Sequence, residues 1–369
     1  MGEKVLMKGN EALAEAAIRA GCHMYYGYPI TPQSEVAAYM SAHLPPIGGT
    51  FIQAESEIAA VNMLYGASAA GARAMTASSS PGISLKGEGI SYMLAGDLPG
   101  LIVNINRCGP GLGGIQPAQG DYWMATRATG HGDGHVFVFA PYTVQEMADL
   151  TRKALEMSDQ YRIPAMILAD GLLGQMMEPV ELPEHIALED LPPKPWAVTG
   201  MRGKREKNIV NTLYLQAQAL EDKILERKER YALIKESEQM AQLEQTEDAQ
   251  LIVVAYGASA RIARSAVNMA RAEGLKVGLM RPITLWPFIT KAIDEACATA
   301  SAFLTVELNT GQMVDDVKLA VAGRHPVSFF GHAGGVIPTP DEVFNAIKKA
   351  YAGEQFHILP YQSKLGEGD

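Results

Sequence analysis

The stretch Leu-Ile-Val-Asn-Ile-Asn at residues 101–106, with Arg107 directly after it, decides the fold class of this chain. Short apolar runs of this kind form strands that are buried on both faces of a sheet. Similar runs lie before and after it, and helical patterns separate them. This alternation predicts an α/β fold with a doubly wound parallel sheet. The expected strands are Gly49–Gln53, Arg73–Ala77, Leu101–Asn106, Val136–Ala140 and Ala165–Ala169, and the expected helices are Asn10–Ala20, Ser56–Ala69, Ile83–Ala95 and Val144–Ser158.

A second, smaller α/β block begins near Leu251. Its length of about 100 residues suits one small domain. We therefore divide the chain into a first domain at 1–185, a connector with a charged helical arm at 186–248, a second domain at 249–355 and a tail at 356–369. The expected strands of the second block are Leu251–Ala255, Lys276–Arg281, Ala302–Val306 and Val327–Phe330, and its expected helices are Ala258–Glu273, Phe288–Ala298, Gln312–Ala322 and Pro340–Tyr351.

Residues 202–248 differ from both blocks, since they hold almost no Gly or Pro and many Glu, Lys, Arg and Gln residues. Apolar or long-stemmed residues recur there at 4-3-4-3 spacing, which is typical of an amphipathic helix. Two interpretations stay open: a helix that packs on its own domain, or an arm that docks onto a partner. The spaced residues are Leu213, Ala217, Leu220, Ile224, Arg227, Tyr231 and Ile234.

Composition excludes several classes of protein. The 369 residues include 31 Lys and Arg against 41 Asp and Glu, so the net charge of −10 excludes nucleic-acid binding that rests on phosphate contacts. No apolar run approaches the ~20 residues of a membrane span, and the N-terminus lacks the apolar core of a signal peptide. The three cysteines, Cys22, Cys108 and Cys297, form no CxxC pair, which excludes a four-cysteine cluster on this chain and predicts a reducing, cytoplasmic location.

Two glycine-rich motifs fail on their context. Gly109–Gly114 matches GxGxxG, but poor helix formers follow it, and a dinucleotide site needs a helix N-terminus there. We interpret it as a loop that lines a substrate site. Gly132-Asp133-Gly134 resembles the start of a thiamine-diphosphate motif, but no Asn follows at the required distance, so we interpret it as a turn. His131 and His135 lack a set of ligand partners, so we expect loop roles for them. His332, beside Gly334 and Gly335, is the best functional candidate of the second block, but a loop role is expected for it as well.

Three other stretches carry groups that are suited to chemistry. Tyr28-Pro-Ile-Thr-Pro-Gln-Ser34 is a loop stiffened by its prolines, and it presents the hydroxyls of Thr31 and Ser34. Glu57 stands where a strand leads into an apolar helix, so its carboxylate either complements the helix N-terminus or, if enclosed, holds a proton. Arg107 follows a strand at the edge where open α/β sheets bind ligands, and its planar fork suits a carboxylate. Each stretch also has a plain structural interpretation, as a turn, a helix end and a surface ion pair.

Together these stretches resemble the alpha subunits of 2-oxoacid:ferredoxin oxidoreductases, and YPITP is the most specific of them. The resemblance implies a first domain of the thiamine-diphosphate type that binds the pyrimidine half of the cofactor, and a second domain like the transketolase C-terminal domain. The motifs are Gly27–Glu35, Ser56–Gly66, Ser78–Gly82, Asn106–Gly111 and Gly130–Asp133 in the first domain, and Arg281–Phe288, Val306–Met313 and Gly334–Pro340 in the second.

The resemblance also implies residue roles. Glu57 would share a proton with the aminopyrimidine ring of thiamine diphosphate, and desolvation between subunits would favour that sharing. Thr31 and Arg107 would bind the 2-oxoacid, and Gln33, a departure from many relatives, would alter the pocket. No metal ligand is expected on this chain. The other expected site residues are Tyr28 and Ser34 for the substrate, and Pro29 and Ser80 for the cofactor.

By the same resemblance, this subunit acts only with partners. A beta subunit would hold the Mg²⁺ and the diphosphate of the cofactor, while gamma and ferredoxin-like subunits would carry iron–sulfur clusters. The expected reaction is oxidative decarboxylation of a 2-oxoacid, with coenzyme A as acyl acceptor and ferredoxin as electron acceptor. Branched-chain 3-methyl-2-oxobutanoate is the first expected substrate, and 2-oxoglutarate, pyruvate and indolepyruvate follow. The alternatives are a thiamine-dependent lyase or synthase without ferredoxin, and a non-catalytic scaffold subunit.

Overall fold

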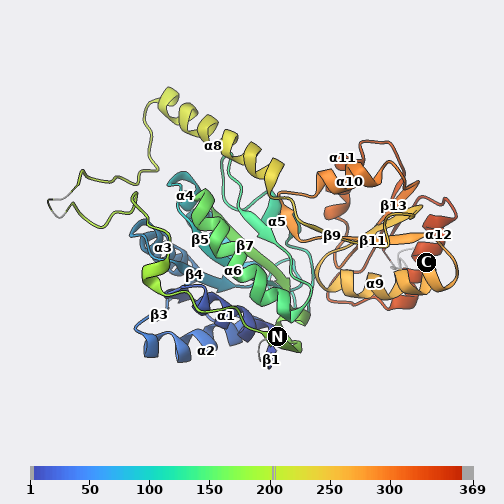
Figure 1. The fold of residues 1–369 in the computed structure, drawn as a ribbon, viewed down its shortest axis with the longest axis horizontal. Coiled ribbons are helices and arrows are strands. Elements are labelled where there is room, and N and C mark those ends of the chain that lie inside the picture. Colours follow the sequence, from blue (N-terminus) through green and yellow to red (C-terminus); the bar gives the residue numbers. More distant parts are fainter. Residues whose placement is uncertain (1–3, 202, 204, 360–369) are drawn as a thin grey trace, which may run out of the picture.

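The computed structural model describes residues 4–201, 203 and 205–359. Two large sheets and a two-stranded ribbon organise this part of the chain (Figure 1). Of the expected tail at 356–369, residues 360–369 lie outside the described residues. The remainder includes β15 (His357–Ile358), which pairs in parallel with β14 (Val327–Gly331) and so extends the second sheet.

The first sheet is the predicted doubly wound sheet, in the strand order β12-β6-β7-β5-β4-β2-β3. Its neighbours pair in parallel except at β12, which is antiparallel to β6. Every residue of β5 and β7 is buried, and alternate side chains point to opposite faces, so both faces of the sheet are covered. The strands are β2 (Met24–Gly27), β3 (Thr50–Gln53), β4 (Ala74–Ser78), β5 (Gly100–Asn106), β6 (Phe137–Phe139), β7 (Pro164–Asp170) and β12 (Thr284–Trp286).

The helices of the first domain pack in two groups. α1 contacts α2, α6 and α7, and α3 packs along α4. Short polar side chains fix two of the helix starts, since Ser56 caps α3 and Thr143 caps α6. The ribbon of β1 (Lys4–Lys8) and β8 (Met177–Glu181) lies beside α1 and α6. The helices are α1 (Gly9–Arg19), α2 (Ser34–His43), α3 (Glu57–Ala69), α4 (Ser80–Ala95), α5 (Tyr122–Thr126), α6 (Val144–Tyr161) and α7 (Gly171–Gln175), with 3₁₀ turns at Pro45–Ile47 and Leu188–Asp190.

The second sheet has the order β15-β14-β13-β10-β11-β9, and only the β9–β11 pair is antiparallel. Figure 1 shows α10 and α11 on the opposite side of this sheet from α9. Among the described residues, no helix combines the length and the apolar character that crossing a bilayer requires. The elements are β9 (Ala241–Glu244), β10 (Leu251–Val254), α9 (Gly257–Ala272), β11 (Val277–Pro282), α10 (Thr290–Ala296), β13 (Ala302–Glu307), α11 (Met313–Val321) and α12 (Pro340–Tyr351).

The two sheets belong to one packed body, because the second half of the chain gives β12 to the first sheet. Near this strand Arg281 donates to both carboxylate oxygens of Glu146, at 2.6 and 3.0 Å, and its guanidinium lies 3.9 Å from the ring centre of Tyr142. Gln119 exchanges hydrogen bonds with the main chain of Leu308. These buried polar contacts fix how the halves of the chain meet.

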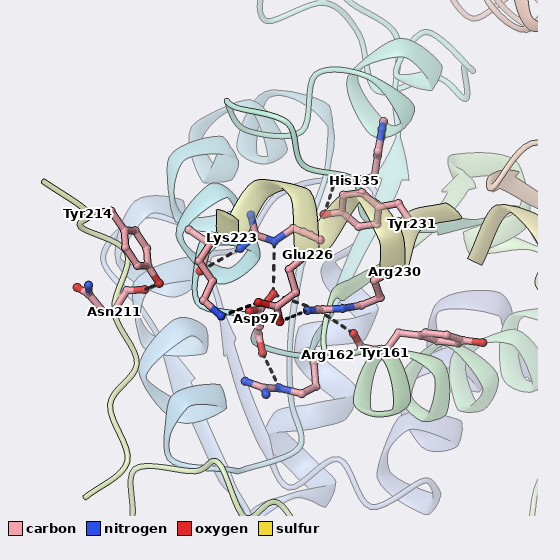
Figure 2. A network of polar contacts seen from close by, with 12 residues as sticks. Asp97, His135, Tyr161, Arg162, Asn211, Tyr214, Lys223, Glu226, Arg230 and Tyr231 are labelled. Atoms are coloured by element: carbon pink, nitrogen blue, oxygen red, sulfur yellow. Dashed lines mark hydrogen bonds and ion pairs between the residues drawn. The ribbon is translucent and has the colours of Figure 1, made fainter. Parts of the chain in front are cut away.

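The helical arm packs on its own domain through a shared carboxylate (Figure 2). α8 (Ala217–Ser237) buries Arg227, Tyr231 and Ile234. Asp97, at the end of α4, accepts a bond of 3.0 Å from Arg230 and one of 3.4 Å from Arg227. A carboxylate with two guanidinium partners holds both arginines in place.

The predicted extent of the helical arm was wrong. Residues 202 and 204 lie outside the described residues, 205–216 are not helical, and β9 follows α8. Leu213 and Leu220 of the spaced set are exposed. Asparagine side chains explain the late helix start, because Asn208 binds the Pro195 carbonyl and Asn211 accepts from the Leu213 N–H. Such local bonds compete with helix formation.

Candidate active site

Glu57 is the first residue of α3 and is also buried, with 6% of its surface exposed. The Ser56 hydroxyl accepts a 3.2 Å bond from the Ala59 N–H and fixes the helix start. The Glu57 side chain lies against Gly82 on α4. A Cβ at Gly82 would come within 2.7 Å of Glu57 Oε1 and within 2.0 Å of Ser78 Oγ. A glycine is therefore required for the carboxylate to fit between α3 and α4.

The polar groups around this carboxylate lack partners. Among the described residues, the Glu57 carboxylate accepts no hydrogen bond, and Glu57 contributes only its main-chain carbonyl to Lys86 Nζ, at 3.4 Å. The buried hydroxyls of Ser78 and Ser79 have no partner either. Since buried polar groups are almost always bonded, these atoms indicate a site that a polar ligand completes. The N-terminus of α3 stabilises negative charge there.

Arg107 lies at the carboxyl end of β5, where its buried guanidinium joins two loops. Nη1 donates to the Thr31 carbonyl at 3.0 Å, and Nη2 donates to the Leu112 carbonyl at 3.2 Å. Nε is buried without a partner, and no described carboxylate forms an ion pair with this residue. The alternative of a surface ion pair is therefore excluded. A buried cation without a counter-ion is costly and suits an anionic ligand.

The loop at residues 28–34 runs from β2 to α2 and is braced from within. Gln33 is fully buried, and its amide donates to the Tyr28 carbonyl at 3.2 Å. Gln33 thus stabilises the conformation of the loop from its buried side and does not reach the groove. Thr31 and Ser34 are exposed on the outer side, where they border a groove of about 770 Å³. Other residues of the groove are Glu35, Ile115, Pro117 and Leu172.

The first turn of α4 connects the two halves of the site. The Ser80 hydroxyl lies 3.1 Å from both the N–H and the carbonyl of Arg107, accepting from one and donating to the other. Two residues later, Gly82 contacts Glu57. The first turn of α4 therefore contacts both Glu57, whose carboxylate accepts no hydrogen bond from a described residue, and Arg107, whose guanidinium has no counter-ion among them. The structure brings Thr31, Ser80 and Arg107 together, while Tyr28 and Pro29 lie exposed on the loop.

Sequence reasoning missed two polar groups near the site. Asp121 accepts a hydrogen bond of 2.8 Å from Asn104 Nδ2. Burial raises the pKa of Asp121, and the hydrogen bonds from Ser80 and Asn104 oppose that shift. It borders a cavity of about 380 Å³ between the loop at 109–120 and the second domain, where Asn309 also lies. Asn309 belongs to the motif at 306–313, so that motif was the available signal. The second missed group is Lys86, which lies on the buried face of α4, where an apolar side chain is expected.

Two of the histidines contact neighbouring side chains. His135 stacks on Trp286 with ring centres 4.8 Å apart, and burial lowers its pKa. His332 lies 3.6 Å from Glu342. In the part of the chain that the structure describes, no three His, Cys, Asp or Glu side chains gather as a metal site.

Known proteins match nearly all of the chain. Residues 15–246 match the family "Pyruvate flavodoxin/ferredoxin oxidoreductase, thiamine diP-bdg", and residues 249–343 match "Pyruvate:ferredoxin oxidoreductase core domain II". The ketoisovalerate oxidoreductase subunit VorB of Methanothermobacter marburgensis is 47% identical, over 95% of this chain and 98% of that relative. The 2-oxoglutarate synthase subunit KorA of Methanothermobacter thermautotrophicus is 33% identical, over 95% and 99%.

Solved structures agree in fold. The 2-oxoglutarate:ferredoxin oxidoreductase of Magnetococcus marinus, with 2-oxoglutarate, coenzyme A and succinyl-CoA bound, aligns with a TM-score of 0.83 at 26% identity. The alignment covers 95% of this chain and 66% of that one. A split-gene transketolase, an inactive beta4 tetramer, aligns with a TM-score of 0.55 at 14% identity, over 95% and 99%, which shows a shared fold alone.

Proposed function

This chain belongs to the thiamine-diphosphate-binding family of 2-oxoacid:ferredoxin oxidoreductase subunits, and we propose that it supplies Glu57 and Arg107 to the oxidative decarboxylation of a branched-chain 2-oxoacid. The products are an acyl-CoA, CO2 and reduced ferredoxin. The observation that carries the proposal is the first turn of α4, which holds the main chain of Arg107 through Ser80 and the side chain of Glu57 through Gly82.

The residues around Glu57 fit the pyrimidine half of thiamine diphosphate. A buried carboxylate with free lone pairs can accept a hydrogen bond from a ring N–H, and the unpaired hydroxyl of Ser78 lies at the same face of Gly82 as the Glu57 carboxylate. The cofactor supplies the electron sink for decarboxylation. With the cofactor bound, Glu57 would accept and return the proton of a ring N–H, which is the role of a general base. The exposed Pro29 would add an apolar contact to the cofactor, and Ser80 supports the site through Arg107.

Arg107 and Thr31 bind the carboxylate of the 2-oxoacid. The guanidinium keeps a free N–H at Nε and unused hydrogens on both terminal nitrogens, which is enough for a charge-assisted bond to a carboxylate. The Thr31 hydroxyl adds a donor beside it, and Tyr28 and Ser34 complete the substrate side of the loop. Because the Arg107 guanidinium is already buried in the free protein, substrate binding does not have to remove it from water.

The groove next to Thr31 favours an apolar substrate side chain. Ile115, Pro117 and Leu172 line it, and its charged member is the acid Glu35, which is paired with Lys8 at 3.4 Å. A second carboxylate, as in 2-oxoglutarate, would meet no free cation of the described groove residues and would be repelled by Glu35. The relative VorB is named for ketoisovalerate, which is 3-methyl-2-oxobutanoate. We therefore propose this substrate ahead of 2-oxoglutarate.

The partner with the metal-binding half of the cofactor would cover the carboxyl edge of the first sheet. Large apolar side chains are exposed on elements that meet that edge, and we interpret them as the rim of an interface. They lie at the end of β3, in the first turn of α3, in the second turn of α4, and in the loop after β5. We propose a beta subunit here, with gamma and ferredoxin-like chains carrying the iron–sulfur clusters. The rim residues are Ile52, Ile58, Leu85, Leu112 and Ile115.

Two other expectations remain predictions. The cytoplasmic location rests on the sparse cysteines, which are free in the structure. The division at residues 185, 248 and 355 rests on the sequence pattern.

A substrate panel tests the proposed function. The complex is purified anaerobically through a tag on this chain, and coenzyme-A-dependent viologen reduction is measured with 3-methyl-2-oxobutanoate, 2-oxoglutarate, pyruvate and indolepyruvate. The highest kcat/KM is expected for 3-methyl-2-oxobutanoate. A higher kcat/KM for 2-oxoglutarate would contradict the substrate assignment, and no reduction with any 2-oxoacid would contradict the reaction.

A further inference from the structure

Lys86 is a fully buried lysine that the reaction described above does not use. It lies on α4 four residues after Gly82, so both residues face α3. Gly82 contacts the Glu57 side chain, and Lys86 Nζ donates to the Glu57 carbonyl at 3.4 Å. One turn further on, a Cβ at Gly89 would lie 2.5 Å from Val61. The close packing of α4 on α3 thus buries the Lys86 ammonium group next to the first turn of α3.

The position is unfavourable for a cation. Lys86 is 0% exposed and forms no ion pair with any described residue. Its single hydrogen bond is a long one to a neutral carbonyl, and the N-terminus of α3 repels positive charge. Burial lowers the pKa of Lys86 from 10.5 to about 8. An apolar side chain of similar length would fill this space without these costs.

One anionic group offsets the cost. Of the elements packed against α4, α3 contributes Glu57, whose charge raises the pKa of Lys86 and so opposes the effect of burial. Among the described residues, β5 and β7 add no charge that acts on Lys86. The attraction between opposite charges is mutual, so the Lys86 ammonium also favours negative charge at Glu57.

We infer that Lys86 is a positioning residue whose charge keeps the Glu57 carboxylate ionised until a ring nitrogen of the cofactor contacts it. This inference rests on the proposed function for the purpose of that ionisation, whereas the proximity of Lys86 to Glu57 rests on the packing of α4 against α3. Glu57 is buried, and burial favours proton uptake by a carboxylate that has no cation nearby. A fixed cation behind the helix start prevents this and leaves the front of the carboxylate open.

The test measures the titration of Glu57 without turnover. The infrared absorption of protonated carboxyl groups is recorded against pH in the assembled complex without thiamine diphosphate. The difference between wild type and Glu57→Gln isolates the signal of Glu57. In Lys86→Met the midpoint should move up by about 1–2 pH units, and Lys86→Arg should restore it. The acidic limb of kcat/KM should move in parallel. Equal midpoints in wild type and Lys86→Met would overturn the inference.

A reciprocal measurement covers the case in which the Lys86 variants fail to assemble. Competitive acetylation, read by mass spectrometry, reports the pKa of Lys86 in wild type and in Glu57→Gln. Loss of the Glu57 charge should lower that pKa further, and an unchanged value would overturn the inference. The proposed function fails separately, if Glu57→Gln turns over normally while the two titrations remain coupled.

Discussion

Replacing the buried Lys86 by Met should stabilise this protein, although it should impair the site. Lys86 carries a charge that is closed off from solvent and has no ion-pair partner among the described residues. Methionine has a similar length, is apolar and adapts its shape to a helix interface. The substitution therefore removes a desolvation cost and keeps the packing of α3 on α4. Stability and activity often oppose each other in this way at functional sites.

The magnitude follows from the shift in the pKa of Lys86, from 10.5 to about 8. At 1.36 kcal/mol per unit, the shift corresponds to about 3 kcal/mol. Below pH 8 the lysine is protonated in both the folded and the unfolded state, so the folded state carries the whole penalty. Between pH 8 and 10.5 the unfolded state binds more protons, and the stability of the wild type rises with pH. Above pH 10.5 the penalty is absent.

Thermal unfolding from pH 7 to pH 10.5 measures this effect. At pH 7 the Lys86→Met protein should unfold at a temperature roughly 6–12 °C above that of the wild type, if the first domain unfolds as one unit. The gap should close as the pH approaches 10.5. Lys228→Met, at an exposed position of α8, is the matched control and should change stability by less than about 0.5 kcal/mol. A less stable Lys86→Met protein, or a gap that does not depend on pH, would refute the reasoning.

Three further substitutions test the site and the arm. Arg107→Lys keeps the charge but loses the planar fork, so kcat/KM for the 2-oxoacid should fall by about 30- to 1000-fold, corresponding to about 2–4 kcal/mol; an unchanged value would remove Arg107 from the substrate site. Gly82→Ala places a methyl group 2.0 Å from Ser78 Oγ and should cost about 1–3 kcal/mol together with most of the activity. The control Gly87→Ala, on the same helix with its nearest atoms 3.7 Å away, should stabilise the protein by about 0.5–1 kcal/mol in thermal unfolding, and equal effects of the two changes would contradict the packing argument. Asp97→Asn removes the anion between Arg227 and Arg230, so cleavage of α8 by a protease should accelerate about tenfold, and an unchanged rate would mean that other contacts hold the arm.

The sequence predicted the elements whose signal is local. β5, β7 and β10 are continuous apolar runs, and α6 and α12 have the spacing and caps of helices, so their positions agree with the structure within a few residues. β12 was missed because three residues carry little pattern. Its pairing with β6 joins positions far apart in the chain, and local sequence does not encode such pairing. α8 began later than predicted because the spacing counted apolar residues and ignored the asparagines before it.

The candidate site divides in the same way. The positions of Glu57 at a helix start and of Arg107 after a strand could be predicted, because each depends on its own neighbours in the chain. What Gly82 and Lys86 do could not be predicted, since both act across the interface between α3 and α4. The engagement of the Ser80 hydroxyl with the main chain of Arg107 also depends on how β5 meets α4.

The most direct test of the central claim compares wild type with Glu57→Gln in the complex assembled under anaerobic conditions. The measurement is viologen reduction with 3-methyl-2-oxobutanoate that depends on both thiamine diphosphate and coenzyme A. The variant should assemble normally, because the Glu57 carboxylate makes no hydrogen bond to another described residue, and its kcat should fall by about 10²–10⁴-fold. A kcat within a few-fold of the wild type would contradict the claim that this chain supplies the catalytic carboxylate.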